Sequence, residues 1–255
     1  MHVPSPSLHS DPAPLPLVPT RAAFLRSPVG WLRTLDPTQP LWQIVFFRFC
    51  SWIVMLLVTF LYRLRFYGLH NLPPSGTGGL LVVANHQSHW DPPVLGIAFR
   101  TRNMASIARE GLFKAPGLKQ LLLGLGAIPI KESEGDAGAI RTAIAELKKG
   151  RLTLIFPEGS RSPDGEIKDF KRGAWVLLSR AKCDVMPAAI EGAFDSWPRR
   201  RHFPGLFGHR IGVAFGKPIP YNELKALGAD AGLARLQSEV ERLRADLAVR
   251  LGIER

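Results

Sequence analysis

From residue 80 onward, short apolar runs alternate with longer stretches in which apolar positions recur every three or four residues. The short runs are typical of buried strands, and the periodic stretches are typical of amphipathic helices. We expect strands at residues 80–84, 104–108, 127–130, 152–156, 185–190 and 210–215. We expect helices at residues 93–99, 112–123, 137–149, 173–181 and 222–251. This alternation predicts an α/β fold in which helices flank a mixed, largely parallel sheet.

A more uniformly apolar stretch precedes this alternating region. Residues 41–62 contain one charged residue, Arg48, and the arginines Arg63 and Arg65 follow them. A membrane-spanning helix needs about 20 mostly apolar residues, and the uninterrupted run at 49–62 is shorter. The aromatic content of the stretch is typical of lipid-headgroup depth, which favours an interfacial membrane-associating helix. A true span and a buried core helix stay open, and either membrane interpretation places the flanking arginines on the cytoplasmic side.

The first part of the chain has a different character. Residues 1–40 are rich in proline and have no apolar periodicity, so we expect a disordered or extended segment. They lack the basic start and apolar core of a secretory signal. We therefore divide the chain into this N-terminal segment, a hydrophobic helical element at 41–65 and one α/β domain at 66–255.

The chain is strongly basic. It has 33 Lys and Arg against 21 Asp and Glu, a formal net charge of +12. Such a surface favours anionic partners: nucleic acid, acidic phospholipid or a phosphate-bearing donor. The two cysteines, Cys50 and Cys183, are far apart, which argues against a disulfide framework or a zinc site. Charge alone does not separate an enzyme from a basic membrane- or nucleic-acid-binding protein.

Polar side chains follow the predicted strand at 80–84. The sequence Asn-His-Gln-Ser-His-Trp-Asp at 85–91 places His86 and Asp91 on one turn, close enough for contact. Histidine titrates near neutral pH and a carboxylate can fix its tautomer, so the pair can accept a proton from a hydroxyl. The non-catalytic alternative is that His86 is an exposed loop histidine and that Asp91 is a helix N-cap. A metal site that includes His89 is disfavoured, because no further imidazole or thiolate has suitable spacing.

The predicted strand at 152–156 also runs into a polar loop, Pro-Glu-Gly-Ser-Arg-Ser at 157–162. Active-site loops lie at the carboxyl ends of parallel strands, so the two loops predict one site. Arg161 suits phosphate, because a guanidinium can contact two of its oxygens. Ser160 is not the nucleophile of a Gly-x-Ser-x-Gly elbow, since Ser162 stands where glycine is needed. No complete phosphate-loop motif occurs, so a nucleotide-binding fold is not supported.

The motifs Asn-His-x4-Asp and Phe-Pro-Glu-Gly-x-Arg-Ser together resemble those of the glycerolipid acyltransferase superfamily, most closely the 1-acylglycerol-3-phosphate acyltransferases. Two weaker blocks occur in the expected order, Gly-Ala-Ile-Pro-Ile-Lys at 126–131 and Val-Met-Pro-Ala-Ala-Ile-Glu-Gly at 185–192. The resemblance covers about residues 65–220 and implies that residues 66–255 form an acyltransferase domain.

The resemblance also implies roles for single residues. His86 would be the general base for the acceptor hydroxyl, with Asp91 holding its other ring nitrogen. Glu158 would hydrogen-bond the acceptor hydroxyl. The expected substrate-binding residues are Lys131, Glu158, Gly159, Ser160, Arg161 and Lys171. Lys131 stands where the family usually has arginine, so it would hold a phosphate without a planar fork.

The function implied by the resemblance is acyl transfer from acyl-CoA or acyl carrier protein to 1-acyl-glycerol-3-phosphate, which yields phosphatidic acid in phospholipid biosynthesis. No cofactor is expected besides the acyl donor. The expected partners are the lysophospholipid acceptor, the donor carrier and an anionic membrane surface, and not nucleic acid. Alternative acceptors are a lyso-ornithine lipid, another lysophospholipid or glycerol 3-phosphate. A non-catalytic basic binding protein is the rival from another class, and it leaves the paired motifs unexplained.

Overall fold

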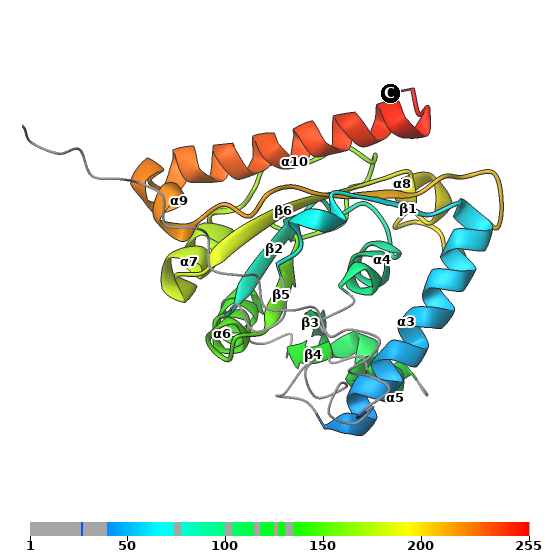
Figure 1. Ribbon diagram of the computed structural model, residues 1–255, viewed down its shortest axis with the longest axis horizontal. Helices are drawn as coiled ribbons and strands as arrows, with labels where there is room; N and C mark the ends of the chain where they lie inside the picture. The colour runs from blue at the N-terminus through cyan, green and yellow to red at the C-terminus, as the bar shows by residue number, and fades with distance from the viewer. Residues whose placement is uncertain are drawn as a thin grey trace, which may run out of the picture.

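The computed structural model describes residues 27, 40–73, 78–99, 104–114, 118–124, 127–130 and 135–254. Within these ranges a seven-stranded sheet lies between two layers of helices (Figure 1). Helices α6, α7 and α10 pack on one face of the sheet, and helices α3 and α4 pack on the other. The expected extended segment at 1–40 falls almost wholly outside the described residues, as does Lys131.

The sheet is mixed and largely parallel, which confirms the predicted fold class. Its strands are β1 (Arg65–Tyr67), β2 (Leu80–Ala84), β3 (Met104–Arg109), β4 (Ala127–Ile130), β5 (Leu152–Ile155), β6 (Asp184–Glu191) and β7 (Gly212–Phe215). Their order across the sheet is β1-β7-β6-β2-β5-β3-β4. Only the β6–β7 pair among these is antiparallel, so β1 and β7 run opposite to the other strands. Strand β1 was not predicted, because three residues are too short for a periodic pattern.

The helices are α3 (Leu41–Tyr62), α4 (Asp91–Ala98), α5 (Leu118–Gly124), α6 (Gly135–Lys148), α7 (Arg172–Ala181), α8 (Ala193–Ser196), α9 (Tyr221–Leu227) and α10 (Ala229–Leu251), with short 3-10 helices η1 (Leu69–Asn71) and η2 (Glu110–Lys114). The prediction of one helix at 222–251 was wrong. Gly228 lies between α9 and α10 with φ of +80°, a left-handed conformation that ends a helix and that glycine adopts without strain. The helix expected at 112–123 was also wrong, because its first residues form η2 and α5 begins only at Leu118.

Strand β2 lies at the centre of the core and is buried along its whole length. Leu80 and Val82 contribute to the core beneath α3 and α4, whereas Leu81 and Val83 contribute to the core beneath α6, α7 and α10. A strand buried on both faces has no polar side to show, which explains its uninterrupted apolar sequence. This packing holds the residues that follow β2 in a fixed position.

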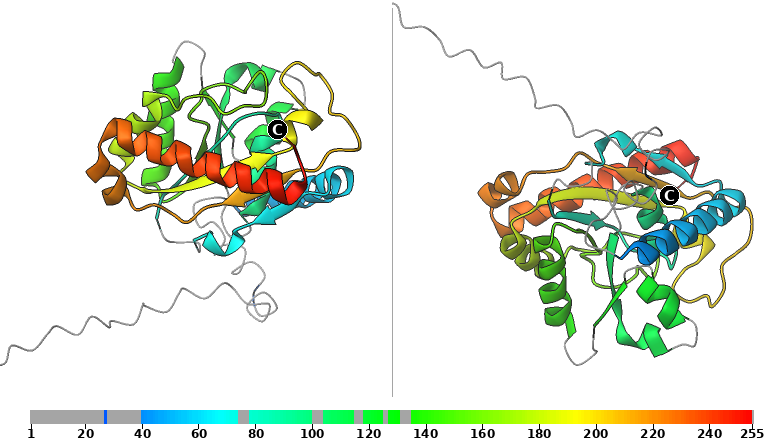
Figure 2. Two further views of the ribbon diagram at one scale, coloured as in Figure 1. Left: turned by 90° about the horizontal axis from the view of Figure 1, so that it is seen from above. Right: turned by 60° about the horizontal axis from the view of Figure 1, so that its bottom comes forward.

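Helix α3 has two different faces. Ile44, Phe47, Val58 and Tyr62 are buried against the domain. The exposed apolar side chains are Trp42, Val45, Phe49, Trp52, Leu56, Leu57 and Phe60, which we call the α3 outer face. The helix is long and apolar enough to cross a membrane, and only 17% of its most apolar window is buried. Figures 1 and 2 show α3 along the outside of the molecule, at the end opposite to α9. This exposure disfavours the interpretation of α3 as a buried core helix.

Candidate active site

The two polar loops predicted to form one site lie side by side. Strands β2 and β5 are neighbours in parallel register, with Val83 opposite Ile155. The loops that follow them are joined by the backbone N–H of His86, which donates to Glu158 Oε1 at 2.7 Å. The backbone N–H of Ser162 donates to the carbonyl oxygen of His86 at 2.7 Å. The register of the sheet therefore brings a histidine, a carboxylate and a cation to one edge.

His86 and Asp91 are in direct contact. Nδ1 of His86 lies 2.8 Å from Oδ2 of Asp91. The same oxygen accepts the backbone N–H groups of Gln87 and Ser88, each at 2.7 Å, and the Asp91 side chain is fully buried. With Nδ1 turned to the carboxylate, Nε2 is the ring nitrogen left to exchange a proton with a substrate. His86 is largely buried, so the alternative of a solvent-exposed loop histidine does not fit.

The alternative interpretation expected Asp91 to be the N-cap of α4, and the structure contradicts it. Trp90 is the residue that precedes the first turn, and Asp91 is the first residue of the helix. Its carboxylate instead closes the loop in front of the helix through Gln87 and Ser88. The side chain thus fixes the loop backbone and the His86 ring together, because one oxygen contacts both.

The imidazole plane is set by a residue that sequence reasoning did not single out. The Phe156 ring stacks on His86 with centroids 3.9 Å apart and an interplanar angle of 13°. Phe156 directly follows β5, so it reaches His86 from the neighbouring strand. A carboxylate contact fixes one edge of the ring and an aromatic contact fixes its face. Together they leave the imidazole little freedom to rotate.

Asn85 belongs to the motif at 85–91, but no role in the site was predicted for it from the sequence. Its side chain accepts the backbone N–H of Ile190 and donates to the carbonyl oxygen of the same residue, both at 2.9 Å. Gln87 donates to that carbonyl as well, at 2.9 Å. Asn85 thereby continues the pairing of β2 with β6 for one residue beyond the strand. The loop that carries His86 is anchored on this side to β6.

Glu158 joins the two loops. Oε1 accepts the His86 N–H, and Oε2 accepts the Lys168 N–H at 3.2 Å. Burial raises the pKa of Glu158 above its usual value, although these two backbone donors oppose the shift. Both oxygens therefore position the loops, and the expected bond to an acceptor hydroxyl stays a prediction.

Gly159 and Lys171 lie against each other. Gly159 has φ of +73°, and a Cβ atom there would be 2.6 Å from Nζ of Lys171. The Lys171 N–H donates to the carbonyl oxygen of Pro157 at 3.0 Å, which holds the lysine beside the loop. The positive φ favours glycine at position 159, and the lysine amine lies close beside it. Half-buried Ser160 lies on the same loop and its binding role stays a prediction.

Arg161 contacts a second histidine, whose position the sequence did not predict. Its Nη1 atom contacts Nε2 of His89. Burial, followed by the positive charge of Arg161, lowers the pKa of His89 to about 4. A neutral His89 can accept a hydrogen bond from the guanidinium, and its ring packs on Trp197 with centroids 4.8 Å apart. His89 thus helps to position Arg161.

Lys131 lies outside the described residues, so its expected role in substrate binding stays a prediction. Strand β4 ends at Ile130, on the same carboxyl edge as β2 and β5 but separated from β5 by β3. Across the described part of the chain, His, Cys, Asp and Glu side chains form no group of three or more that could hold a metal ion.

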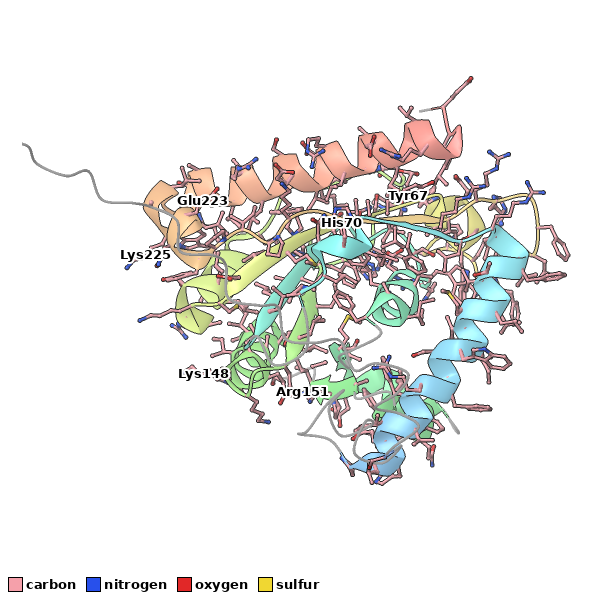
Figure 3. The ribbon with its side chains drawn as sticks, in the orientation of Figure 1. Tyr67, His70, Lys148, Arg151, Glu223 and Lys225 are labelled. Carbon is pink, nitrogen blue, oxygen red and sulfur yellow. The ribbon has the colours of Figure 1, made fainter. Side chains whose placement is uncertain are left out.

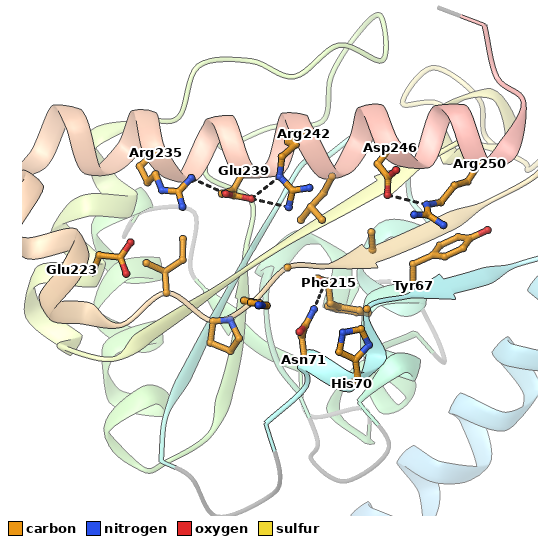
Figure 4. Close-up of a pocket in the computed structure, with 17 residues that line it drawn as sticks. Tyr67, His70, Asn71, Phe215, Glu223, Arg235, Glu239, Arg242, Asp246 and Arg250 are labelled. Carbon is orange, nitrogen blue, oxygen red and sulfur yellow. Dashed lines mark hydrogen bonds and ion pairs between the residues drawn. The ribbon is translucent and has the colours of Figure 1, made fainter. Parts of the chain in front are cut away.

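A separate groove lies away from this edge of the sheet. It has a volume of about 660 Å³ and lies between α10, β7 and η1, where Tyr67 and His70 line it (Figures 3 and 4). The charges along α10 are paired with one another: Glu239 with Arg235 at 2.6 Å and with Arg242 at 3.0 Å, and Asp246 with Arg250 at 2.8 Å. Such pairs are typical of a solvated helix face. The candidate active site is therefore placed at the carboxyl ends of β2 and β5 because of the side chains found there, and not because of the volume of a groove.

Comparisons with known proteins agree with the mixed, largely parallel α/β fold. The structure is similar to the crystal structure of the 1-acyl-sn-glycerophosphate acyltransferase PlsC from Thermotoga maritima, with a TM-score of 0.66 and 24% identity over 86% of this chain and 88% of that chain. A 1-acyl-sn-glycerol-3-phosphate acyltransferase of Streptococcus pneumoniae is 28% identical over 204 residues, 78% of this chain and 73% of that protein.

Further relatives match over a shorter part of their length. The chloroplastic 1-acyl-sn-glycerol-3-phosphate acyltransferase LPAT1 of Arabidopsis thaliana is 29% identical over 161 residues, 62% of this chain and 44% of that protein. The match thus spans less than half of the plant relative. The model of the Acyltransferase family matches residues 63–191, half of the chain, and this region contains both the His86 and the Glu158 loops. The chain therefore belongs to the acyltransferase family.

Proposed function

We propose that this chain transfers a fatty acyl group from an acyl thioester to the free hydroxyl of 1-acyl-glycerol-3-phosphate, forming phosphatidic acid. The observation that carries the proposal is the His86–Asp91 pair, held at 2.8 Å beside a loop that bears Arg161. Relatives named 1-acyl-sn-glycerol-3-phosphate acyltransferase from a plant and a bacterium support the choice of acceptor.

In this mechanism Nε2 of His86 takes the proton of the acceptor hydroxyl as its oxygen attacks the thioester carbonyl carbon. Asp91 stabilises the imidazolium that forms. The tetrahedral intermediate collapses, the carbon–sulfur bond breaks, and the proton passes from His86 to the leaving thiolate. General base assistance of this kind contributes about 10²–10⁴-fold to a rate. No covalent acyl-enzyme is required, because the hydroxyl attacks the donor directly.

Two cations suit the phosphate of the acceptor. Arg161 presents a planar guanidinium that matches phosphate oxygens, and the Lys171 amine lies over Gly159 on the same loop. His89 faces Arg161 as a neutral group, so it leaves the positive charge for the substrate. The phosphate would thus be held beside the loop that follows β5, with the hydroxyl directed to His86.

The membrane would supply the acceptor. Helix α3 presents an exposed apolar face, and the net charge of +12 favours an anionic bilayer. We place the enzyme on the cytoplasmic face of a membrane, peripheral or anchored through α3, where acyl-CoA or acyl carrier protein delivers the thioester. Both donors present anionic carriers to a basic protein.

A panel of acceptors tests this proposal. Wild-type protein in detergent micelles is given acyl-CoA or acyl carrier protein thioester with lysophosphatidic acid, glycerol 3-phosphate, a neutral lysophospholipid or a lyso-ornithine lipid. We expect phosphatidic acid from lysophosphatidic acid at the highest kcat/KM, because Arg161 and Lys171 offer two cations to a phosphomonoester. Thioester consumption with any other acceptor preferred would contradict the proposed substrate while keeping the reaction class.

A further inference from the structure

The loop between α8 and β7 carries exposed apolar side chains beside a run of arginines. Phe203, Leu206 and Phe207 are 83%, 59% and 67% exposed. Arginines 199, 200 and 201 precede them and are also exposed. Single exposed apolar residues are common, but three within five positions next to three cations combine two features that suit an anionic lipid surface. We call residues 199–207 the aromatic loop.

The aromatic loop adjoins the end of α3. The hydroxyl of Tyr62, the last residue of α3, donates to the carbonyl oxygen of Gly205 at 2.7 Å. The N–H of Gly205 donates to the carbonyl oxygen of Ser196 at 2.7 Å, which fixes the return of the loop. Figure 1 shows the loop passing beside this end of α3. The aromatic loop therefore adjoins one end of α3, the helix that carries the exposed apolar α3 outer face.

The residues that precede the aromatic loop are bonded to the loop that carries His86. The carbonyl oxygen of Trp197 accepts Oγ of Ser88 at 2.8 Å and the N–H of His89 at 3.4 Å. Its indole N–H donates to the carbonyl oxygen of Arg201 at 3.1 Å. The segment from Trp197 to Gly205 thus contacts both α3 and the loop that carries His86. It joins the candidate site to the helix whose outer face is exposed and apolar.

We propose that the aromatic loop is a second membrane-contacting element, which enters the headgroup region of an anionic phospholipid bilayer beside α3. Phe203 and Phe207 bury their rings among the lipids, and the arginines pair with lipid phosphates. The loop thereby holds the entrance of the site against the bilayer. Its effect on catalysis rests on the proposed function, whereas its contact with lipid does not.

A spin label at Leu206→Cys tests the contact directly, in the full chain with Cys50→Ser and Cys183→Ala. The control is a label at Leu227→Cys, an exposed apolar position on α9, and Figure 1 shows α9 at the end of the molecule opposite to α3. In vesicles of phosphatidylglycerol and phosphatidylcholine, we expect the label at 206 to gain oxygen accessibility and lose contact with a water-soluble nickel reagent. The label at 227 should keep its contact with water.

Equal water exposure of both labels in vesicles would overturn the inference. Burial of the label at 206 without vesicles would also overturn it, since the loop would then contact a second copy of the chain. The label reports lipid contact whether or not the protein acylates lysophosphatidic acid, so this result is independent of the proposed function.

A double variant, Phe203→Ser with Phe207→Ser, tests the catalytic consequence. We expect about tenfold slower acyl transfer to a long-chain acceptor embedded in anionic vesicles, because two apolar anchors are lost. Transfer to a short-chain, water-soluble acceptor should be unchanged, and Leu227→Ser should match wild type on both. Equal loss on both acceptors, or loss on neither, would contradict the role of the loop.

Discussion

At the scale of single residues, the candidate site depends on one ring held from two sides. Asp91 contacts the His86 edge at 2.8 Å and Phe156 stacks on its face at 3.9 Å. The spacing of the motif predicts the first contact, because five residues on one turn bring the side chains together. The second contact depends on the register of β2 and β5, which a single sequence does not display. The same holds for His89, which meets Arg161 across the two loops.

The pKa of His89 leads to a pH prediction. Its folded-state value of about 4 lies below the ordinary 6.5, so the unfolded chain binds more protons between these values. The stability that neutral His89 contributes is present above pH 6.5 and is lost as the pH falls towards 4. We expect the Tm of the wild type to drop over this window and that of His89→Gln to drop less, because glutamine can accept from Arg161 without charging. Exposed His70→Gln is the control, and equal drops in wild type and His89→Gln would contradict this account.

At the scale of elements, the ends of the strands decide where the chemistry lies. The apolar runs and helical periodicities predicted most elements to within a few residues, because each is buried on a regular face. The positions where one helix ends and the next begins were harder to predict. Gly228, with its φ of +80°, separates α9 from α10. Anchors between elements were not visible either, such as the bonds of Asn85 to Ile190 that continue β2 alongside β6.

Replacing that anchor should destabilise the fold. In Asn85→Ala the buried N–H of Ile190 loses its acceptor, which should lower the free energy of unfolding by about 2–3 kcal/mol. Activity should fall as well, because the His86 loop then keeps only the Gln87 bond to Ile190 of β6. Chemical denaturation of the purified protein in detergent measures the change, with exposed Asn222→Ala as the control. A loss no larger than that of the control would show that Asn85 is not an anchor.

At the scale of the whole molecule, one arginine links the long C-terminal helix to the site. Arg244 on α10 contacts buried Glu191 at the end of β6 at 2.7 Å and Glu166 in the loop after β5 at 2.8 Å. These contacts and the Glu158 bonds hold the β5 loop from two directions. The apolar positions that recur every three or four residues along α10 are all buried: Leu233, Leu236, Val240, Leu243, Leu247 and Leu251. The sequence did not predict this ion pair, because the partners lie far apart along the chain.

Replacement of Arg244 should lower the free energy of unfolding. Arg244→Met removes the guanidinium that contacts the buried Glu191 carboxylate, which should cost about 3–5 kcal/mol of unfolding free energy. Arg235→Met removes an exposed pair with Glu239 on the same helix and should cost under about 1 kcal/mol. Urea denaturation of the two variants compares the pairs directly. Similar losses in both would show that the buried pair does not hold α10 in place.

In the proposed mechanism His86 is the base for acyl transfer to a lysophospholipid. The most direct test measures phosphatidic acid formed from acyl-CoA and lysophosphatidic acid by wild type, His86→Ala and His70→Ala. His70 is an exposed histidine on η1 and lines the groove beside α10. We predict that kcat falls by about 10² or more in His86→Ala and stays at the wild-type value in His70→Ala. Equal rates of product formation in all three proteins would contradict the account.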